Sequence, residues 1–266
     1  MSSNSLTQVI NNITSGINQM NAALAALPAP APNQANMVAA LQGSVPLLQS
    51  MQSQILSFAK NASSVLNYAL SDINNSNYSD ATTKIQAVNT SANTLKTATN
   101  DANTQLSKIT PQIISVGAEL NNMRNSLSSQ LASLQGQLQD AQNQVDYYNK
   151  RKWYFLLLGP FGIAGVATAV ALIVTWTQKV NGYQSDVNNI NNQINAANNS
   201  INSVGNAQSV CIDSINNVSS INNTVDVMFA DITEVIADLS STTPVTAKLY
   251  VTAALTEVQI LETDAL

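Results

Sequence analysis

Apolar residues recur at every third or fourth position along most of the chain, a spacing typical of helices with one buried face. This pattern predicts five helices, over residues 6–27, 36–74, 80–152, 177–241 and 245–262. The third and fourth are long enough to form rods, and a strongly apolar stretch lies between them. We therefore expect an all-α protein. It would be an elongated five-helix bundle whose two longest helices form an antiparallel coiled coil and carry a small hydrophobic head.

Proline marks most of the expected joints between helices. The PAPAP sequence at residues 28–32 ends the first helix. Pro46 should kink the second helix or mark its true start, and Asp80 is expected to cap the third. Pro111 should bend the third helix, and Pro244 should end the fourth.

The third predicted helix carries a long apolar seam. Its positions are Ile85, Val88, Ala92, Leu95, Thr99, Ala102, Leu106, Ile109, Ile113, Val116, Leu120, Met123, Leu127, Leu131, Leu134, Leu138, Ala141, Val145 and Tyr148. The steps alternate between three and four residues, with one extra step of four between Leu127 and Leu131. Such a stutter locally unwinds a supercoil. The whole rod would measure roughly 110 Å.

The fourth predicted helix has a matching seam. It runs through Val187, Ile190, Ile194, Ala197, Ile201, Val204, Gln208, Cys211, Ile215, Val218, Asn222, Val225, Phe229, Ile232, Ile236 and Leu239. Ile212, Ile221, Met228 and Val235 widen the apolar stripe in the later half. Because a wide stripe suits burial among several helices, we expect a multi-helix bundle after about residue 208 and a thinner stalk before it.

The sequence WYFLLLGPFGIAGVATAVALIVTW, residues 153–176, contains no charged residue. As a single helix it would extend roughly 36 Å, enough to cross a bilayer. As a β-hairpin, residues 153–158 and 163–168 would pair across the GPFG turn. As an unequal helical hairpin, residues 161–176 would form the longer arm, roughly 24 Å long. Either hairpin lets the two rods bury each other's seams within one chain, so we favour a hairpin.

This segment and its flanks supply the candidate site residues. The membrane-inserting candidates are Trp153, Tyr154, Phe155, Leu156, Leu157, Leu158, Gly159, Pro160, Phe161, Gly162, Ile163, Val166, Val170, Leu172, Ile173, Val174 and Trp176. Lys150, Arg151, Lys152 and Lys179 are candidates for contact with lipid headgroups. The aromatic residues at both ends of the segment would meet at the base of a hairpin and occupy one membrane interface.

The composition argues against several classes of function. Only 9% of residues are charged and the net charge is −5, which argues against nucleic-acid binding. There is no histidine and a single cysteine, so metal sites and nucleophile pairs built from these residues are excluded. We find no constellation for enzyme chemistry and expect no cofactor. The N-terminus lacks the charged and apolar regions of a secretory signal, so any secretion would need another route.

Some polar residues also have a structural interpretation. Cys211 lies on the seam and is expected to be a small buried core residue. Gln208 and Asn222 either set the helix register or face water. The acidic residues Asp226, Asp231, Glu234 and Asp238 are expected to form a solvated helix face.

The layout resembles the ClyA-type α-helical pore-forming toxins, which include components of two- and three-part cytolysins of the haemolysin BL and Nhe types. The resemblance rests on an apolar segment, residues 153–176, held between long rods at 80–152 and 177–241, with helices at 6–27, 36–74 and 245–262 completing the bundle. It implies a tail of residues 1–152 and 177–266 and a head of residues 153–176.

The resemblance also implies a mechanism. A soluble, secreted form would mask the head, which would then insert into a target-cell membrane. Copies of the chain, or the other components of a two- or three-part toxin, would assemble into a pore. A strongly apolar head suits the component that anchors the assembly. The alternatives are a membrane-anchored coiled-coil structural or adhesion protein and a secretion-system translocator.

Overall fold

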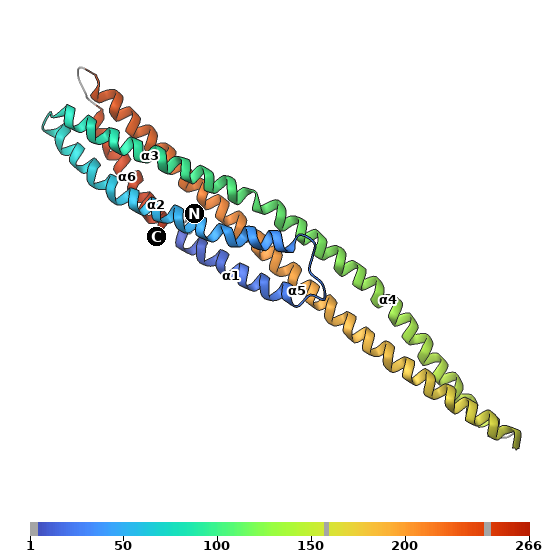
Figure 1. Cartoon of the computed structure of the whole chain (residues 1–266). Coiled ribbons are helices and arrows are strands. Elements are labelled where there is room, and N and C mark those ends of the chain that lie inside the picture. The colour runs from blue at the N-terminus through green and yellow to red at the C-terminus, as the bar shows by residue number, and fades with distance from the viewer. Residues whose placement is uncertain (1–4, 157–159, 242–245) are drawn as a thin grey trace. The chain divides into compact units, whose positions relative to one another are not determined.

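The computed structural model describes residues 5–156, 160–241 and 246–266, with side chains outside 152–167. It contains the helices α1 (Leu6–Ala25), α2 (Gln34–Asn74), α3 (Tyr78–Ser107), α4 (Ile109–Leu156), α5 (Pro160–Leu239) and α6 (Ala247–Ala265) (Figure 1). The described residues include no β-strand. The prediction of five helices is confirmed, with the third divided into α3 and α4.

The division of the third helix at Lys108 follows from Pro111. A proline has no N–H group, and its ring collides with the carbonyl four residues earlier, here that of Ser107. Helix α3 therefore ends at Ser107, and Pro111 falls in the first turn of α4, where a missing donor costs nothing. The expected bend is thus a break in the helix.

Helix α2 spans nearly the predicted range, and Pro46 lies inside it, which leaves the kink as the alternative for this proline. One predicted cap was wrong. Helix α3 begins after Asn77, and Asp80 lies within its first turn, where its carboxylate accepts a hydrogen bond of 2.8 Å from the Asn77 side chain. Pro244 lies outside the described residues.

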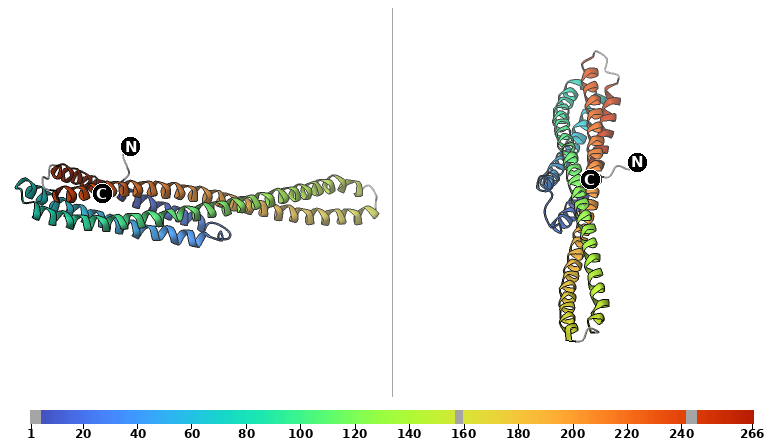
Figure 2. Two further views of the ribbon diagram at one scale, coloured as in Figure 1. Left: turned by 90° about the horizontal axis from the view of Figure 1, so that it is seen from above. Right: turned by 90° about the vertical axis from the view of Figure 1, so that its right-hand side faces the viewer.

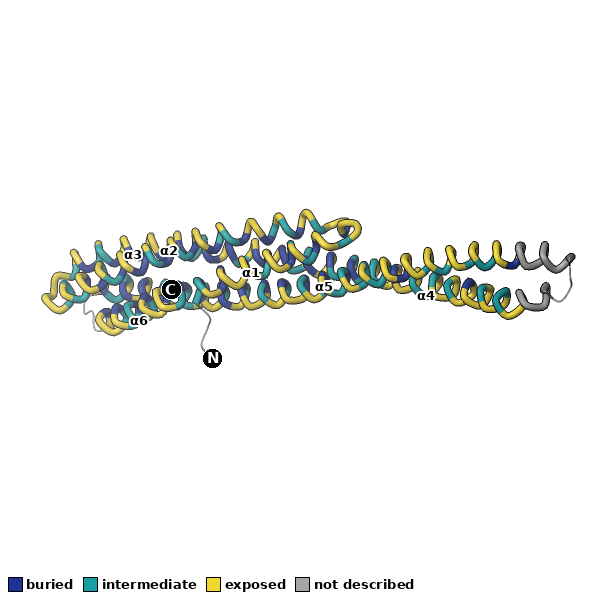
Figure 3. The backbone as a smooth tube through the Cα atoms, turned by 90° about the horizontal axis from the view of Figure 1, so that it is seen from below, coloured by how far each residue is buried: buried dark blue, intermediate teal, exposed yellow. Residues whose placement is uncertain are grey.

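The chain forms two compact units. The first, here called the tail unit, contains Met1–Asn21, Pro32–Val116 and Ser203–Leu266. The second, the stalk unit, contains Ala22–Ala31 and Gly117–Asn202. Figure 3 shows how burial is distributed along the helices of each.

The tail unit has a closed apolar core, as the wide stripe after residue 208 predicts. Helix α2 packs against both α3 and α6. Ile221, Met228 and Val235 are buried as expected. Ile212 was assigned wrongly, because its side chain is 41% exposed. Position 214 faces the core in its place and holds a buried serine.

A row of polar contacts joins α5 to α3 and the start of α4. The row consists of Lys96 with Asp226 at 2.8 Å, Thr99 with Asn222 at 2.8 Å, Asn103 with Ser219 at 3.3 Å and Thr110 with Cys211 at 3.8 Å. Residue numbers rise on one helix as they fall on the other, so the helices are antiparallel in a single register. Asn222 accepts its hydrogen bond from the fully buried Thr99, which favours the register interpretation of this residue.

Helix α6 is attached at both ends. At its start, the Asp238 carboxylate accepts hydrogen bonds from the backbone N–H groups of Thr246 and Ala247. At its end, the side-chain amide of Gln52 donates to the Ala265 carbonyl at 2.6 Å and to the Thr7 hydroxyl at 2.7 Å. One glutamine of α2 thereby links α1 and α6.

The stalk unit consists mainly of two long antiparallel helical arms, the later part of α4 and the first part of α5 (Figure 2). Several of its seam residues are only half-buried, namely Leu131, Leu134, Leu138, Ile190, Ile194 and Ile201. Ala141 and Ala197, with smaller side chains, are fully buried. This pattern agrees with the expected thinner stalk.

Candidate functional site

The apolar segment 153–176 belongs to both arms of the stalk unit. Residues 153–156 form the last turn of α4, and Pro160 begins α5. Residues 157–159, which include Leu157, Leu158 and Gly159, lie outside the described residues. The described parts of the segment are helical, so the unequal helical hairpin is the geometry that they adopt and the strand pair is not.

The two apolar arms differ greatly in length, which corrects one prediction. Trp153 lies three residues before the end of α4, or about 5 Å along the helix axis. Trp176 lies sixteen residues after the start of α5, or about 24 Å. The arms run antiparallel (Figure 2), so positions 153 and 176 lie at different distances along them and do not form a shared base. Before Trp153, α4 carries the cations 150–152 and the polar residues Asp146 and Asn149.

The described side chains of the α5 arm are covered unevenly. Ala169 is buried at 2% exposure, whereas Val170 and Val174 are 48% and 51% exposed. Leu172, Ile173 and Trp176 are half-buried. Among the described side chains of the arm, Val170 and Val174 therefore form an apolar face that is half open to solvent. The side chains of Lys152 and the candidates from 153 to 166 lie outside the described residues.

Two of the cations that are predicted to contact lipid headgroups lie over aromatic rings. The Arg151 guanidinium lies 4.2 Å from the ring centre of Tyr147 and donates a hydrogen bond to its hydroxyl. The Lys179 ammonium lies 4.1 Å from the ring centre of Trp176. Lys150 is exposed. Each pair combines a cation with a ring at a distance typical of cation–π attraction.

Tyr147 was missed as a site residue. It is 44% exposed and packs edge to face on Tyr148, with ring centres 5.2 Å apart. Its spacing of four residues from Arg151 places the two on one helix face, and this signal was available in the sequence.

The remaining polar candidates have structural roles. Cys211 is buried as predicted, and burial raises the pKa of its thiol while the hydrogen bond with Thr110 opposes that rise. The acidic residues are not merely a solvated face. Asp226 pairs with Lys96, and Asp238 caps α6.

Asp231 lies beside Glu257 of α6. Burial raises the pKa of the Asp231 carboxyl. The pKa of Glu257 is also raised, by burial first and then by the negative charge of Asp231. Within the described residues, no group of three or more histidine, cysteine, aspartate or glutamate side chains is arranged to hold a metal ion.

No helix within the described residues is both long and apolar enough to cross a membrane.

No family model and no curated protein sequence matches the chain. Among solved structures, the chain is similar to the soluble AhlC triple head mutant of the tripartite alpha-pore forming toxin AHL from Aeromonas hydrophila. The identity is 26% and the TM-score 0.80, over 98% of this chain and 97% of that one. Soluble AhlC itself gives 25% identity and a TM-score of 0.78, over 99% and 98% of the two chains.

The AhlB pore of the same toxin gives a TM-score of 0.68 at 15% identity, over 98% and 97% of the two chains. At this identity the likeness concerns the fold alone. The matches to AhlC cover the rods, the bundle and the hairpin between them. Over nearly its whole length the structure of the chain is similar to that of soluble AhlC, which agrees with the resemblance to ClyA-type α-pore-forming toxin components.

Proposed function

We propose that the chain is a component of an α-pore-forming toxin, secreted in a water-soluble form that later enters a target-cell membrane by its hairpin end. The observation that carries the proposal is an open apolar face, with Val170 and Val174 half exposed, at the end of a hairpin in a chain similar to soluble AhlC. In water this face is unfavourable, because exposed apolar surface costs roughly 25 cal/mol per Å². A bilayer, or another protein chain, removes that cost.

The unequal arms limit how deeply one copy can enter. A bilayer has a hydrocarbon core about 30 Å thick, and the apolar arm of α5 spans only about 24 Å. On α4 the cations 150–152 begin about 6 Å from the helix end, and such side chains stay at the membrane surface. We therefore propose that each copy anchors in the near half of the bilayer. A path through the membrane would then require further copies or partner components.

The cation–aromatic pairs suit the boundary between water and lipid. Tryptophan and tyrosine rings favour this region, and lysine and arginine there attract anionic headgroups. Arg151 on Tyr147 and Lys179 on Trp176 provide both properties from the two arms of the hairpin. We propose that Lys150, Arg151 and Lys152 contact lipid phosphates once the tip has inserted, and that Lys179, about 28 Å from the start of α5, reaches them because the hairpin lies obliquely in the membrane surface.

A liposome experiment tests the proposal. The purified chain is mixed with vesicles of neutral lipid, with and without added anionic lipid, and membrane binding is measured by flotation. Dye release is then measured with the chain alone and with candidate partner components. We expect binding that increases with anionic lipid, and dye release once assembly is complete. Failure to float with any vesicle, with or without partners, would overturn the proposal.

The same preparation separates the toxin from a permanent membrane anchor. An anchored adhesion protein would require detergent for extraction, and in sealed vesicles a protease would spare only one of the two rods. We expect extraction without detergent and equal digestion of both rods.

A further inference from the structure

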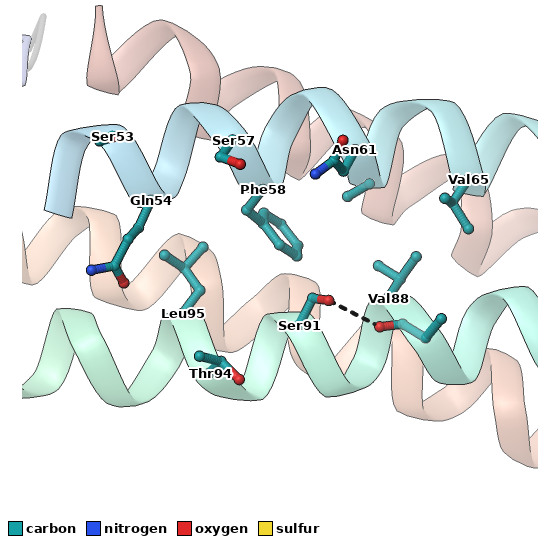
Figure 4. A pocket seen from close by; sticks show the side chains of 12 residues that line it. Ser53, Gln54, Ser57, Phe58, Asn61, Val65, Val88, Ser91, Thr94 and Leu95 are labelled. Carbon is teal, nitrogen blue, oxygen red and sulfur yellow. Dashed lines mark hydrogen bonds between the residues drawn. The ribbon is translucent and has the colours of Figure 1, made fainter. Parts of the chain in front are cut away.

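The tail unit contains a groove between α2 and α3 that the proposed function does not use (Figure 4). Its volume is about 510 Å³. It follows α2 from Ser53 to Val65, which is roughly 18 Å of helix. This volume is within the usual range for small-molecule sites, about 300 to 1,000 Å³.

The floor and the walls of the groove differ in chemistry. The floor is apolar and consists of the buried residues Phe58, Ala62, Val88 and Leu95, together with Val65. The walls consist of exposed hydroxyl and amide side chains, namely Ser53, Gln54, Ser57 and Asn61 on α2 and Ser91 and Thr94 on α3. In Figure 4 Phe58 points into the space between the two helices.

The groove carries no charge. No Asp, Glu, Lys or Arg is among the residues that line it. A phosphate, a carboxylate or an organic cation would find no charged partner in the groove, and a charged ligand pays a large desolvation cost without one. A suitable ligand is therefore neutral.

The polar walls also disfavour purely apolar ligands. A lipid chain or a sterol would cover several hydroxyl and amide groups without offering them hydrogen bonds, at a cost for each group. A suitable ligand has an apolar face for the floor and many hydroxyl groups for the walls. Pyranose rings have both, because their C–H bonds form apolar faces and their hydroxyl groups project from the ring edges.

We propose that the α2–α3 groove binds a neutral oligosaccharide of two or three sugar units. The length of the groove accommodates such a chain. The α2 wall offers donors and acceptors along it, and the α3 hydroxyls, which donate to backbone carbonyls, offer acceptors. The walls are open to water, so each hydrogen bond replaces one to solvent and adds little. We therefore expect millimolar affinity for a single groove. If several copies assemble on a sugar-coated surface, avidity strengthens the attachment.

The binding test uses the full chain in solution and does not depend on membrane insertion. Amide signals of the isotope-labelled protein are followed by NMR during titration with lactose, maltotriose and an N-acetylglucosamine trimer. A sialylated trisaccharide serves as the anionic comparison. We expect at least one neutral sugar to shift signals from 53–65 and 87–95, with the anionic sugar weaker.

A matched pair of variants locates the binding. Thr94 and Thr97 are exposed threonines of α3, and each bonds its hydroxyl to the carbonyl four residues earlier. Only Thr94 lines the groove. Thr94→Phe should abolish the sugar-induced shifts, whereas Thr97→Phe should leave them unchanged. Helicity measured by circular dichroism shows whether both variants fold.

The source of the sugar is determined separately. Vesicles that carry a neutral glycolipid are compared with the same sugar free in solution, using the Val174→Glu variant so that insertion does not contribute. Binding to both the glycolipid vesicles and the free sugar, lost in Thr94→Phe, indicates that the ligand is a cell-surface glycan. Binding to the free sugar alone indicates a soluble saccharide. The proposal is overturned if no neutral sugar shifts the groove signals up to tens of millimolar. It is equally overturned if Thr94→Phe binds as well as the parent, or if only a partner protein perturbs the groove.

Discussion

A single helix, α5, runs through both units, and its seam is buried differently in each. In the tail unit Ile221, Val225, Met228 and Ile232 are all at most 1% exposed. In the stalk unit Ile190, Ile194 and Ile201 are only half-buried. The residue types are similar, so the difference comes from the number of helices packed around them. How deeply a seam residue is buried therefore depends on the number of helices around it as well as on its spacing along the helix.

The largest expected effect is on stability. Ile221→Ala removes a side chain that is 1% exposed and should cost about 3 kcal/mol, since buried isoleucine truncations cost about 2 to 5 kcal/mol. Leu134→Ala in the half-buried stalk seam should cost about 1 kcal/mol, because less apolar area is lost. Urea unfolding of the full chain measures both. Equal losses in the free energy of unfolding for the two variants would contradict this difference between the seams.

The second effect concerns the open apolar face. Val174→Glu places a charge on the inserting arm and should weaken liposome binding about 100-fold, because a charge within the bilayer costs about 2.5 to 3.5 kcal/mol. Val227→Glu is the matched control, since Val174 and Val227 are both 51% exposed on α5. Both variants should keep the helicity of the parent. A similar loss of binding for Val227→Glu would refute a head-specific role.

Replacing Ala169 and Val170 together with charged residues should also abolish insertion. Val170 is 48% exposed, whereas Ala169 is buried, so Val170→Glu alone avoids burying a charge within the stalk unit. We expect unchanged helix content for that single variant by circular dichroism. Liposome flotation then reports insertion alone.

The third effect probes the polar row that distinguishes the tail unit. Thr99→Val keeps the shape of the residue but removes the donor to Asn222, and should cost about 1 to 2 kcal/mol. Thr99→Val combined with Asn222→Leu should recover most of the loss, because no polar group then lacks a partner. Urea unfolding of the parent, the single variants Thr99→Val and Asn222→Leu, and the double variant gives the coupling energy between the two residues. Additive costs would indicate that the contact does not couple the helices.

The fourth effect concerns the cations of the stalk unit. Lys179→Gln or Arg151→Gln should each weaken binding to anionic vesicles about 5-fold, as expected for about 1 kcal/mol per charge. The difference should disappear at high salt, where surface charges are screened. Lys60→Gln, which changes an exposed lysine of the tail unit, is the control and should bind as the parent does.

The smallest effect depends on pH. The raised pKa of Glu257 and Asp231 means that the folded tail holds these protons more tightly than the unfolded chain does. The stabilisation is fully present below the unfolded pKa values and is lost as pH rises through the folded ones. Glu257→Gln should therefore stabilise the protein at neutral pH by a few tenths of a kcal/mol, since solvent screens the pair. An unchanged pH profile of thermal unfolding would contradict this assignment.

The sequence was sufficient to predict most of the fold, because seam spacing reports directly on burial. Its errors are local. Ile212 is apolar but is rotated by about 100° from its neighbour Cys211, which takes the core position. The bend expected at Pro111 falls beside a one-residue interruption of the helix at Lys108, which keeps helical dihedral angles. The contacts of Asp238 and Gln52 join residues far apart in sequence, and no local pattern predicts such pairs.

The sequence located the apolar segment but did not determine its shape. A wholly apolar segment has no polar positions to reveal its period, so helix and strand fit it equally well. The GPFG motif indicated a turn without showing how unequal the arms would be. Val170 and Val174 could not be assigned to the open face, because that depends on how the α5 arm lies against α4.

The link between Gln52 and Ala265 has a consequence for biosynthesis. These residues are 213 positions apart, so the tail unit cannot close until α6 has been translated. The hairpin end is translated before α6, while the tail unit is still incomplete. Contacts between distant parts of a chain slow folding and prolong the exposure of apolar surface. A nascent chain of this kind would be a strong client for ribosome-associated chaperones, which would keep the segment 153–176 out of the membranes of the cell that makes it.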